Sequence, residues 1–557
     1  MSIHREVVGE SVLVSVSDKM FAVRMLYRAI RYGIQGTSIP IKIHPLVMTL
    51  IMLLLIPYLG LTQGKQERTE SPNIILILTD DQGWTHSSHH ADPLIPESRS
   101  DYYETPNMDK LAASGVLFTQ GYAPNPICSP SRNSLMFGQN GARHIYNQDH
   151  EWYKKTADWL TIPRALKMAN SDYRAAHFGK WHIAMVPKEA GFDLDDGMNS
   201  NHGGEIFGDG YLNIKDYTEA ADAYIISNNI ENPSKARRAG KPSGHWDDDN
   251  AKDIFGITHR AKKFMKASIE DGKPFYVQLS HYATHLSLVS QKEPYEYFLN
   301  KKTGQRHTNP EFAAMLKDLD TGIGIIMDFV RELGIEDNTF LFLMGDNGGR
   351  MSLNQIAVID QDRELVHAYY SNQHDRNSPL RDGKHSFYEG GIRVPFIASG
   401  PGIGANRVVR IPVTGLDLLP TFAELAGGDV EMTDAIDGGS MVPLLLDDRV
   451  EKIKRNSEYL IFHQSSHRRP RSAIRKDDFK LIKYWSKEAK YTDTPKVELF
   501  NIRHDLGESN NLIHRYPGIA KELEGTLSEF LEKTHAETGT RDIKGAYYRL
   551  MDDIVKE

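Results

Sequence analysis

The sequence predicts an α/β protein with a large, mostly parallel mixed sheet flanked by helices, followed by a smaller C-terminal antiparallel sheet with a closing helix. Largely apolar runs occur at residues 73–79, 275–280 and 339–344, and the first of them is continuous. Runs of this kind are typical of strands that a parallel sheet buries on both faces. From about residue 449, short strand patterns follow one another without a helical pattern between them. That succession favours antiparallel pairing.

The remaining elements are predicted from apolar spacing and from turn residues. A helix is expected over 106–113, closed by Gly115, and a strand over 173–178. An apolar stripe at helical spacing over 316–333 predicts a core helix. In the C-terminal part we expect strands at 459–463, 472–475, 480–485 and 497–501, and a helix at 519–534.

Composition sets limits on the class of protein. The chain has 557 residues, of which 40% are hydrophobic and 25% charged, as in ordinary globular proteins. The formal net charge of −8 argues against a nucleic-acid partner, so an anionic substrate must be met by local positive charge. We expect an N-terminal segment over 1–72, a catalytic domain over 73–448 and a C-terminal subdomain over 449–557.

The N-terminal segment has a basic lead-in and then an apolar run over 46–61, broken by Pro57. This order indicates an export signal or an uncleaved N-terminal anchor, and a buried core helix is the remaining alternative. The run is shorter than the span of about 20 residues that a transmembrane helix needs. We therefore expect an exported protein, either periplasmic, secreted or anchored by this run, with no other membrane contact.

Oxygen-bearing side chains follow two of the predicted buried strands. Asp80 and Asp81 come after the strand at 73–79, and Asp346 and Asn347 come after the strand at 339–344. Open α/β sheets bind ligands at the carboxyl ends of their strands. Either pair alone could be an ordinary turn. Taken together, an all-oxygen set favours calcium or magnesium over zinc.

Basic side chains follow the other two strands. Lys180 and His182 come after the strand at 173–178, and in an extended segment residues two apart share a face. They can therefore point at one anion, although each alone would be an ordinary surface residue. His281 and His285 follow the strand at 275–280.

Cys128 is the only cysteine, which excludes an intramolecular disulfide and a cysteine-rich zinc site. Ser129 as N-cap, Pro130 at the first helical position and Gly138 at the end predict a short helix directly after it. The helix N-terminus would attract an anion, and Arg132 could reach the same anion. A buried apolar filler is the alternative role for the thiol.

The segment CSPSRNSLMFGQ resembles the signature of the formylglycine-dependent sulfatases, C-x-P-x-R followed by an apolar helix and Gly. GKWH at 179–182 and EGGIRVP at 389–395 also resemble family motifs and occur in the family order. The resemblance runs from Asn73 nearly to the C-terminus. It implies an alkaline-phosphatase-like fold and sulfate ester hydrolysis. The related alkaline phosphatases instead bind two zinc ions through histidines.

The resemblance also implies the cofactors and residue roles. A separate maturation enzyme would oxidise Cys128 to formylglycine, whose hydrate attacks sulfur with one hydroxyl and expels sulfate with the other. One divalent cation, Ca²⁺ with Mg²⁺ as the alternative, would be held by Asp80, Asp81, Asp346, Asn347 and the modified Cys128. Arg132 would hold the nucleophile, Lys180 and Lys384 would bind sulfate, His182 would take a proton, and His285, with His281 as second choice, would protonate the departing alcohol.

Two positions depart from the family pattern. Thr284 stands before His285, where the family usually has proline, and His385 follows Lys384, where a small residue is usual. His385 could narrow or recharge the pocket.

A sulfated carbohydrate is the expected substrate. The basic cluster His467, Arg468, Arg469 and Arg471 could meet a sulfated sugar chain, with a solvated loop as the alternative. The alternative functions are a phosphonate or phosphate ester hydrolase that uses the same formylglycine, and a non-catalytic binder of sulfated glycans.

Overall fold

The structure is a computed structural model, and it describes residues 71–144, 159–183, 185–199, 250–285, 288–350, 377–428, 430–464, 471–485, 497–536 and 538. All of them belong to the compact unit Glu70–Glu557. The N-terminal apolar run at 46–61 and residues 467–469 of the basic cluster lie outside the described residues. Among the helices that are described, none has the length and apolar character needed to cross a bilayer.

The main sheet has eight strands in the order β5-β4-β6-β1-β7-β8-β2-β9. Only β8 runs antiparallel to its neighbours β7 and β2, and the other pairs are parallel. The predicted mostly parallel mixed sheet is therefore confirmed. The strands are β1 (Asn73–Thr79), β2 (Val116–Phe118), β4 (Arg174–Gly179), β5 (Leu194–Asp195), β6 (Phe275–Ser280), β7 (Thr339–Gly345), β8 (Phe396–Ser399) and β9 (Arg407–Val409).

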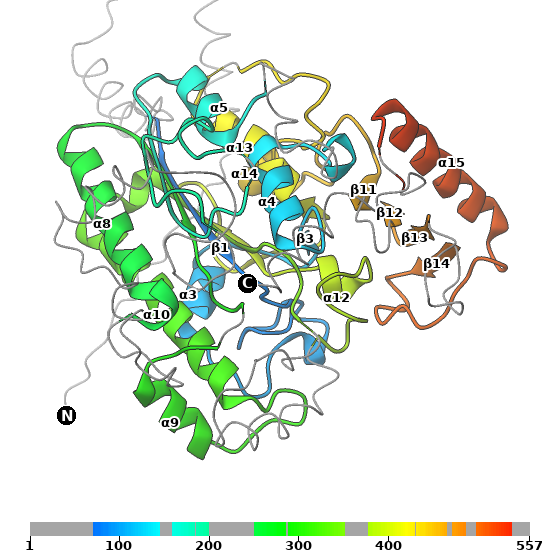
Figure 1. Cartoon of the computed structure of the whole chain (residues 1–557), viewed down its shortest axis with the longest axis horizontal. Helices are drawn as coiled ribbons and strands as arrows, with labels where there is room; N and C mark the ends of the chain where they lie inside the picture. Colours follow the sequence, from blue (N-terminus) through cyan, green and yellow to red (C-terminus); the bar gives the residue numbers. More distant parts are fainter. Residues whose placement is uncertain are drawn as a thin grey trace, which may run out of the picture. The chain divides into compact units, whose positions relative to one another are not determined.

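Helices cover both faces of this sheet, with β1 between them (Figure 1). One face packs against α4 (Cys128–Phe137), α5 (Ile162–Ala169), α13 (Leu418–Leu425) and α14 (Val442–Leu446). The other face packs against α3 (Pro106–Ser114), α8 (Ile254–Glu270) and α10 (Pro310–Glu332). Leu76 faces the first group and Ile75 the second, which is why β1 reads as an unbroken apolar run.

The C-terminal sheet has four antiparallel strands in the order β11-β12-β13-β14, as predicted. They are β11 (Leu460–Gln464), β12 (Arg471–Lys476), β13 (Phe479–Tyr484) and β14 (Val497–Asn501). One face packs under the closing helix α15 (Pro517–Lys533), through residues such as Leu527. The other face packs on Tyr122, Phe387 and Ile392 of the main body.

Several shorter elements lie in the described part of the chain. A two-stranded parallel sheet joins β3 (Gly121–Tyr122) to β10 (Val413–Thr414). The remaining helices among the described residues are α9 (Lys292–Asn300), α12 (Glu389–Ile392), and the 3₁₀ turns η1 (Pro96–Ser98), η2 (Gly141–Arg143), η4 (Ala251–Asp253), η5 (Glu336–Asn338) and η6 (Gly415–Asp417).

The start of α4 differs from the sequence prediction. The helix begins at Cys128 itself, the N-cap is Ile127, and no side chain caps it, so Ser129 is not the cap. Pro130 is the third helical residue, still within the first turn, where its missing N–H removes no helical hydrogen bond. The predicted end is confirmed, because Gly138 adopts a left-handed φ of 61° and donates to the carbonyl of Leu135.

A close approach of β4 to β6 makes a testable prediction. Gly179 has φ +96°, and a Cβ there would lie 2.1 Å from the carbonyl oxygen of Ser280. Gly272 also has a positive φ, +64°, but a Cβ there would meet nothing within 4 Å. Gly179→Ala should cost about 1–2 kcal/mol for its backbone conformation and a further ~1–3 kcal/mol for overpacking.

Gly272→Ala is the matched control and should show only the backbone cost. Thermal unfolding of the two variants measures the difference. Equal shifts in midpoint would contradict the close contact between the two strands.

Candidate active site

The carboxyl ends of four neighbouring strands, β4, β6, β1 and β7, meet at one edge of the main sheet. Backbone pairing continues beyond the strands themselves. The amide of Lys180 donates to Ser280 O at 2.7 Å, and the amide of Asp346 donates to Thr79 O at 2.9 Å. The polar residues that follow the strands are therefore brought together by the sheet, as the sequence pattern predicts.

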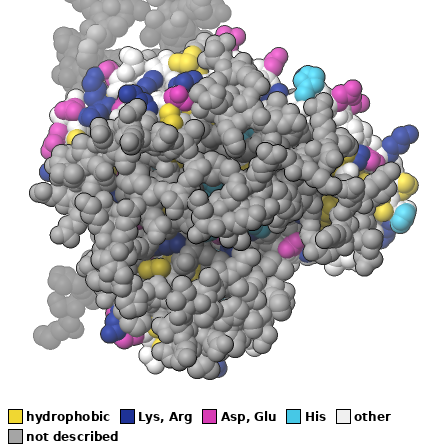
Figure 2. Space-filling view, viewed as in Figure 1, with side chains coloured by type: hydrophobic (Ala, Val, Ile, Leu, Met, Phe, Trp, Pro, Cys, Tyr) yellow, Lys and Arg dark blue, Asp and Glu magenta, His cyan; other side chains and the backbone are white. Residues whose placement is uncertain are grey.

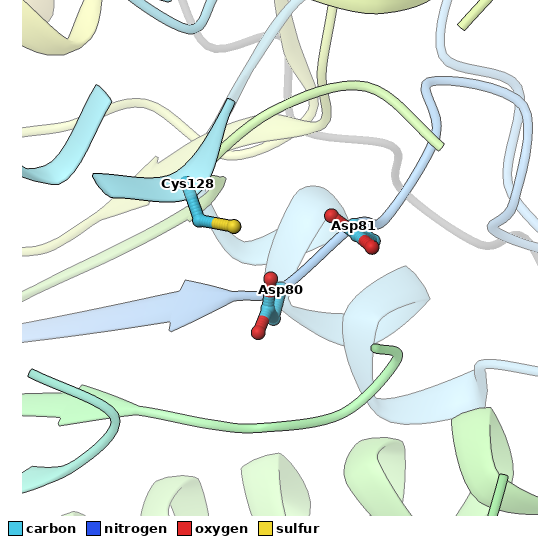
Figure 3. A group of neighbouring side chains, drawn as sticks. All are labelled: Asp80, Asp81 and Cys128. Carbon is cyan, nitrogen blue, oxygen red and sulfur yellow. The ribbon is translucent and has the colours of Figure 1, made fainter. Parts of the chain in front are cut away.

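Carboxylates and the single thiol form the centre of this group. Ligand atoms of Asp80, Asp81 and Cys128 all lie within 4.8 Å of one another, and the three residues are buried. Figure 3 shows the sulfur at the start of α4 pointing toward the two aspartates at the end of β1. Asn347 Nδ2 donates to Asp81 Oδ1 at 2.7 Å, and the Asp81 amide donates to Asp346 Oδ1 at 3.2 Å.

Two buried lysines neutralise the two aspartates that follow β1. Lys180 Nζ lies 2.5 Å from Asp80 Oδ2. Lys384 Nζ lies 2.6 Å from Asp81 Oδ1 and donates to Cys128 Sγ at 3.3 Å. Lys384, more than 250 residues away in sequence from Cys128, therefore contacts the thiol directly.

Arg132 fastens α4 to the ends of two strands. Its Nε donates to Asp346 Oδ2 at 2.8 Å, and its NH1 donates to the Lys180 carbonyl at 2.7 Å. The planar guanidinium suits this divided task, since it presents several donors in a fixed geometry. The helix that carries Cys128 is thereby held against both β7 and β4.

The charges of the site shift one another's pKa values. Burial alone would raise the pKa of Asp80, but the Lys180 ammonium holds it well below its usual range. Burial, and then the negative charge of Asp80, raises the pKa of Asp346 to about 6. Asp81 and the thiol raise the pKa of Lys384 although burial opposes them. The cluster thus combines three acids, Asp80, Asp81 and Asp346, with three cations, Lys180, Lys384 and Arg132.

Of the three histidines considered for proton transfer, two lie in this cluster. His285 Nε2 is 3.8 Å from Asp81 Oδ2, and burial lowers the pKa of His285 to about 4. Burial, and then the charge of Lys180, lowers the pKa of His182 well below its usual value. His281 is different, because the charges that act on its pKa are those of Asp253 and Arg260, outside the cluster.

Three buried oxygens in the cluster test whether these residues fit a cation. Asp80 Oδ1, Asp81 Oδ2 and Asn347 Oδ1 accept no hydrogen bond from any residue that the structure describes. Burying such atoms without a partner is costly. A hard divalent cation, which prefers oxygen ligands, would satisfy all three. The cluster can therefore hold a metal ion.

Residues that sequence reasoning missed support this edge of the sheet. Asn199 accepts from the Trp181 amide at 2.7 Å and donates to Gly179 O at 2.8 Å, which fixes the turn between Lys180 and His182. Thr284, which stands where the family usually has proline, donates from Oγ1 to Asp80 O at 3.1 Å. No motif or periodicity marks either residue.

The two other positions noted in the sequence lie near the site. The His385 amide donates to Pro126 O at 2.9 Å, and burial lowers the pKa of its imidazole to about 4. Arg471 starts β12 and is buried, with its guanidinium 5.8 Å from the centre of the Phe387 ring. It is the one member of the basic cluster that the structure describes.

Comparisons with known proteins identify related chains. The family model described as Sulfatase matches residues 72–428, and a second, N-sulphoglucosamine sulphohydrolase, C-terminal, matches residues 382–536. A "Sulfatase" from Formosa agariphila is 27% identical, covering 88% of this chain and 94% of that protein. The N-acetylgalactosamine-6-sulfatase of Homo sapiens is 30% identical, covering 70% of this chain and 68% of that protein.

Solved structures share the fold. One is described as Ps i-CgsB in complex with k-i-k-neocarrahexaose; it has a TM-score of 0.61 and 24% identity, and the match covers 87% of this chain and 98% of that one. Another is PsFucS1 sulfatase from Pseudoalteromonas sp., with a TM-score of 0.59 and 20% identity over 88% and 95% of the two chains.

Proposed function

We propose that this chain, which belongs to the sulfatase family and hydrolyses sulfate esters, works through a formylglycine formed from Cys128 beside a bound Ca²⁺ ion. The main support for this proposal is the set of side chains around Cys128. Its Sγ lies against Lys384 Nζ and the carboxylates of Asp80 and Asp81. A side chain at this position faces both the ligands of a cation and an ammonium that can bind an anion.

Cys128 would be converted by a separate maturation enzyme. The hydrated aldehyde supplies the hydroxyl that attacks sulfur and, once the alcohol has left, the second hydroxyl that expels sulfate. Arg132 holds this side chain in place through α4, since it ties the helix to Asp346. Lys384 and Lys180 bind sulfate oxygens, because their ammonium groups converge from two sides on the carboxylates beside residue 128.

The histidines move protons. His285 would give a proton to the departing alcohol, and its position 3.8 Å from Asp81 places it at the edge of the cluster. His182 would take the proton that is released when sulfate leaves. Its Nδ1 is buried and has no hydrogen-bond partner among the described residues, so that atom can accept one.

The cation is proposed to be Ca²⁺, with Mg²⁺ as the alternative, bound by Asp80, Asp81, Asp346, Asn347 and the modified residue 128. When bound, it supplies positive charge that favours the ionised diol and offsets the charge of sulfate. The three unpartnered oxygens of Asp80, Asp81 and Asn347 support this ligand set.

A sulfated carbohydrate is the proposed substrate class. It is supported by the relatives' names, such as N-acetylgalactosamine-6-sulfatase, and by the neocarrahexaose complex. In Figure 2 the coloured basic and acidic side chains along the upper margin of the view are intermixed. We further propose export directed by the apolar run at 46–61, and a division into a catalytic part at 73–448 and a C-terminal part at 449–557.

Replacement of the nucleophile tests the mechanism. Protein from the native host should contain an aldehyde at position 128, detectable by mass spectrometry of the peptide. Cys128→Ala should lower sulfate release from sulfated glycans by at least about 1,000-fold, since the nucleophile is lost, without lowering the thermal midpoint. Ser129→Ala, which alters the neighbouring side chain and removes no helix cap, is the control and should keep its activity.

Retained activity in Cys128→Ala would exclude the mechanism. The same preparation separates the alternative functions. Faster turnover of phosphate or phosphonate esters than of sulfate esters would favour a phosphonate or phosphate ester hydrolase. Glycan binding without sulfate release would indicate a binder.

Removal of the cation tests the ligand set. Chelation should abolish sulfate release and lower the thermal midpoint, and added Ca²⁺ should restore both, because an ion that binds only the folded state stabilises it. Asn347→Ala should lose this Ca²⁺-dependent shift. Asn309→Ala, which removes another buried asparagine, the cap of α10, should lower the midpoint but keep the shift. An undiminished shift in Asn347→Ala would exclude Asn347 as a ligand, and restoration by Mg²⁺ alone would identify Mg²⁺.

A further inference from the structure

We propose that Lys480, in the C-terminal sheet, is a positioning residue for Lys384. It would act through a buried charged group, the anchoring cluster, made of Glu389, Arg393, Lys480 and Glu508. The proposal rests on the sulfate-binding role proposed for Lys384. It assigns the C-terminal subdomain a part in the reaction, although none of its charged residues in this cluster touches the site.

Lys480 joins two glutamates in the interior. Its Nζ lies 2.7 Å from Glu389 Oε1 and 2.6 Å from Glu508 Oε1, and all three side chains are 0% exposed. Glu389 Oε2 also lies 3.3 Å from Arg393 NH1 and accepts from the Tyr122 hydroxyl at 2.7 Å. Charges at this depth are tolerated only when they are paired. Lys480 is therefore the cation that allows two carboxylates to meet between the main body and the C-terminal sheet.

The chain segment 381–393 is fastened to the C-terminal part at further points. The Glu389 amide donates to Glu508 Oε2 at 2.6 Å, and Arg381 NH1 donates to the Glu508 carbonyl at 2.6 Å. The Tyr388 hydroxyl donates to Glu498 Oε2 at 2.5 Å. Each contact joins one segment of the main body to β14 or to the turn that follows it.

The same segment carries Lys384 into the site. Residues 381–386 form neither helix nor strand, so no regular hydrogen bonding fixes Lys384. Its amide donates to Gly349 O at 2.9 Å, and the Gly348 amide donates to Gly391 O at 2.9 Å. The segment is thus held by the loop that follows β7, by the bond of the His385 amide to Pro126 O, and by the anchoring cluster. If the cluster is disturbed, one of these supports is lost.

Loss of the Lys480 charge would leave Glu389 and Glu508 buried without their shared cation. Two negative charges at such a short distance disfavour ionisation, so one of the two glutamates must take up a proton or move away from the other. Movement at Glu389, five residues from Lys384, would displace an ammonium that must meet sulfate at hydrogen-bond distance. Because Lys384 binds sulfate in the ground state as well as in the transition state, its displacement should raise KM more than it lowers kcat.

Lys480→Met removes the charge and keeps the length of the side chain. We expect KM for a sulfate ester and the inhibition constant for inorganic sulfate each to rise about 10-fold or more, with kcat per folded enzyme changed by no more than about 3-fold. The matched control is Lys483→Met in the same strand, since Lys483 pairs instead with Glu524 of α15 at 2.8 Å. Both constants should stay unchanged in this control.

A second variant covers the case in which Lys480→Met does not fold. Glu508→Gln keeps the shape of the side chain but removes one carboxylate from Lys480, and it should raise both constants in the same direction by a smaller factor. If the folded variants show the same sulfate inhibition as the wild type, whatever their thermal midpoint, the positioning role is overturned. Lys480 would then have only a structural role.

Lys384→Ala separates this outcome from failure of the proposed function. Loss of sulfate inhibition in Lys384→Ala, with normal inhibition in Lys480→Met, would overturn the anchoring alone. Normal inhibition in Lys384→Ala would overturn the sulfate-binding role of Lys384, and the positioning role of Lys480 with it.

Discussion

The parallel pairing of β1 with β7 is the constraint on which the site depends. Thr79 lies opposite Gly345 in this register, so the residues that follow, Asp80 and Asp346, emerge side by side. Both strands are buried on both faces. A one-residue slip in their register would turn every apolar side chain of a strand to the opposite face of the sheet. The core thus fixes where the carboxylates lie, and the carboxylates in turn fix Lys180, Lys384 and Arg132.

The site keeps its charges in the interior by pairing each acid with a base. Asp80, Asp81 and Asp346 are each paired with a different cation. The three cations come from the residue after β4, from the segment before α12, and from α4. Such pairing offsets the large cost of removing ions from water. It also brings two ammonium groups and a guanidinium to the position where a sulfate group and a metal ion would meet.

The parts of the structure that sequence predicts are those with a local cause. The unbroken run at 73–79 predicts a strand buried on both faces, and the acids after it predict a ligand edge, because strand ends and helix ends share simple rules. The local capping rule predicts Ser129 as the N-cap, but the helix begins at Cys128, two residues earlier than that rule implies. The contact of Lys480 with Glu389 spans 91 residues and follows from the packing of the C-terminal sheet against α12, so no pattern along the chain predicts it.

The central claim is that a divalent ion lies between the ends of β1 and β7, against the side chain of residue 128. A crystal structure of the mature protein with Ca²⁺ tests it most directly. We expect an ion bound by oxygens of Asp80, Asp81, Asp346 and Asn347 at about 2.3–2.6 Å, with an oxygen of the modified residue 128 beside it. An ion bound elsewhere, with Asp80 and Asp81 still paired only to Lys180 and Lys384 at saturating Ca²⁺, would contradict the account.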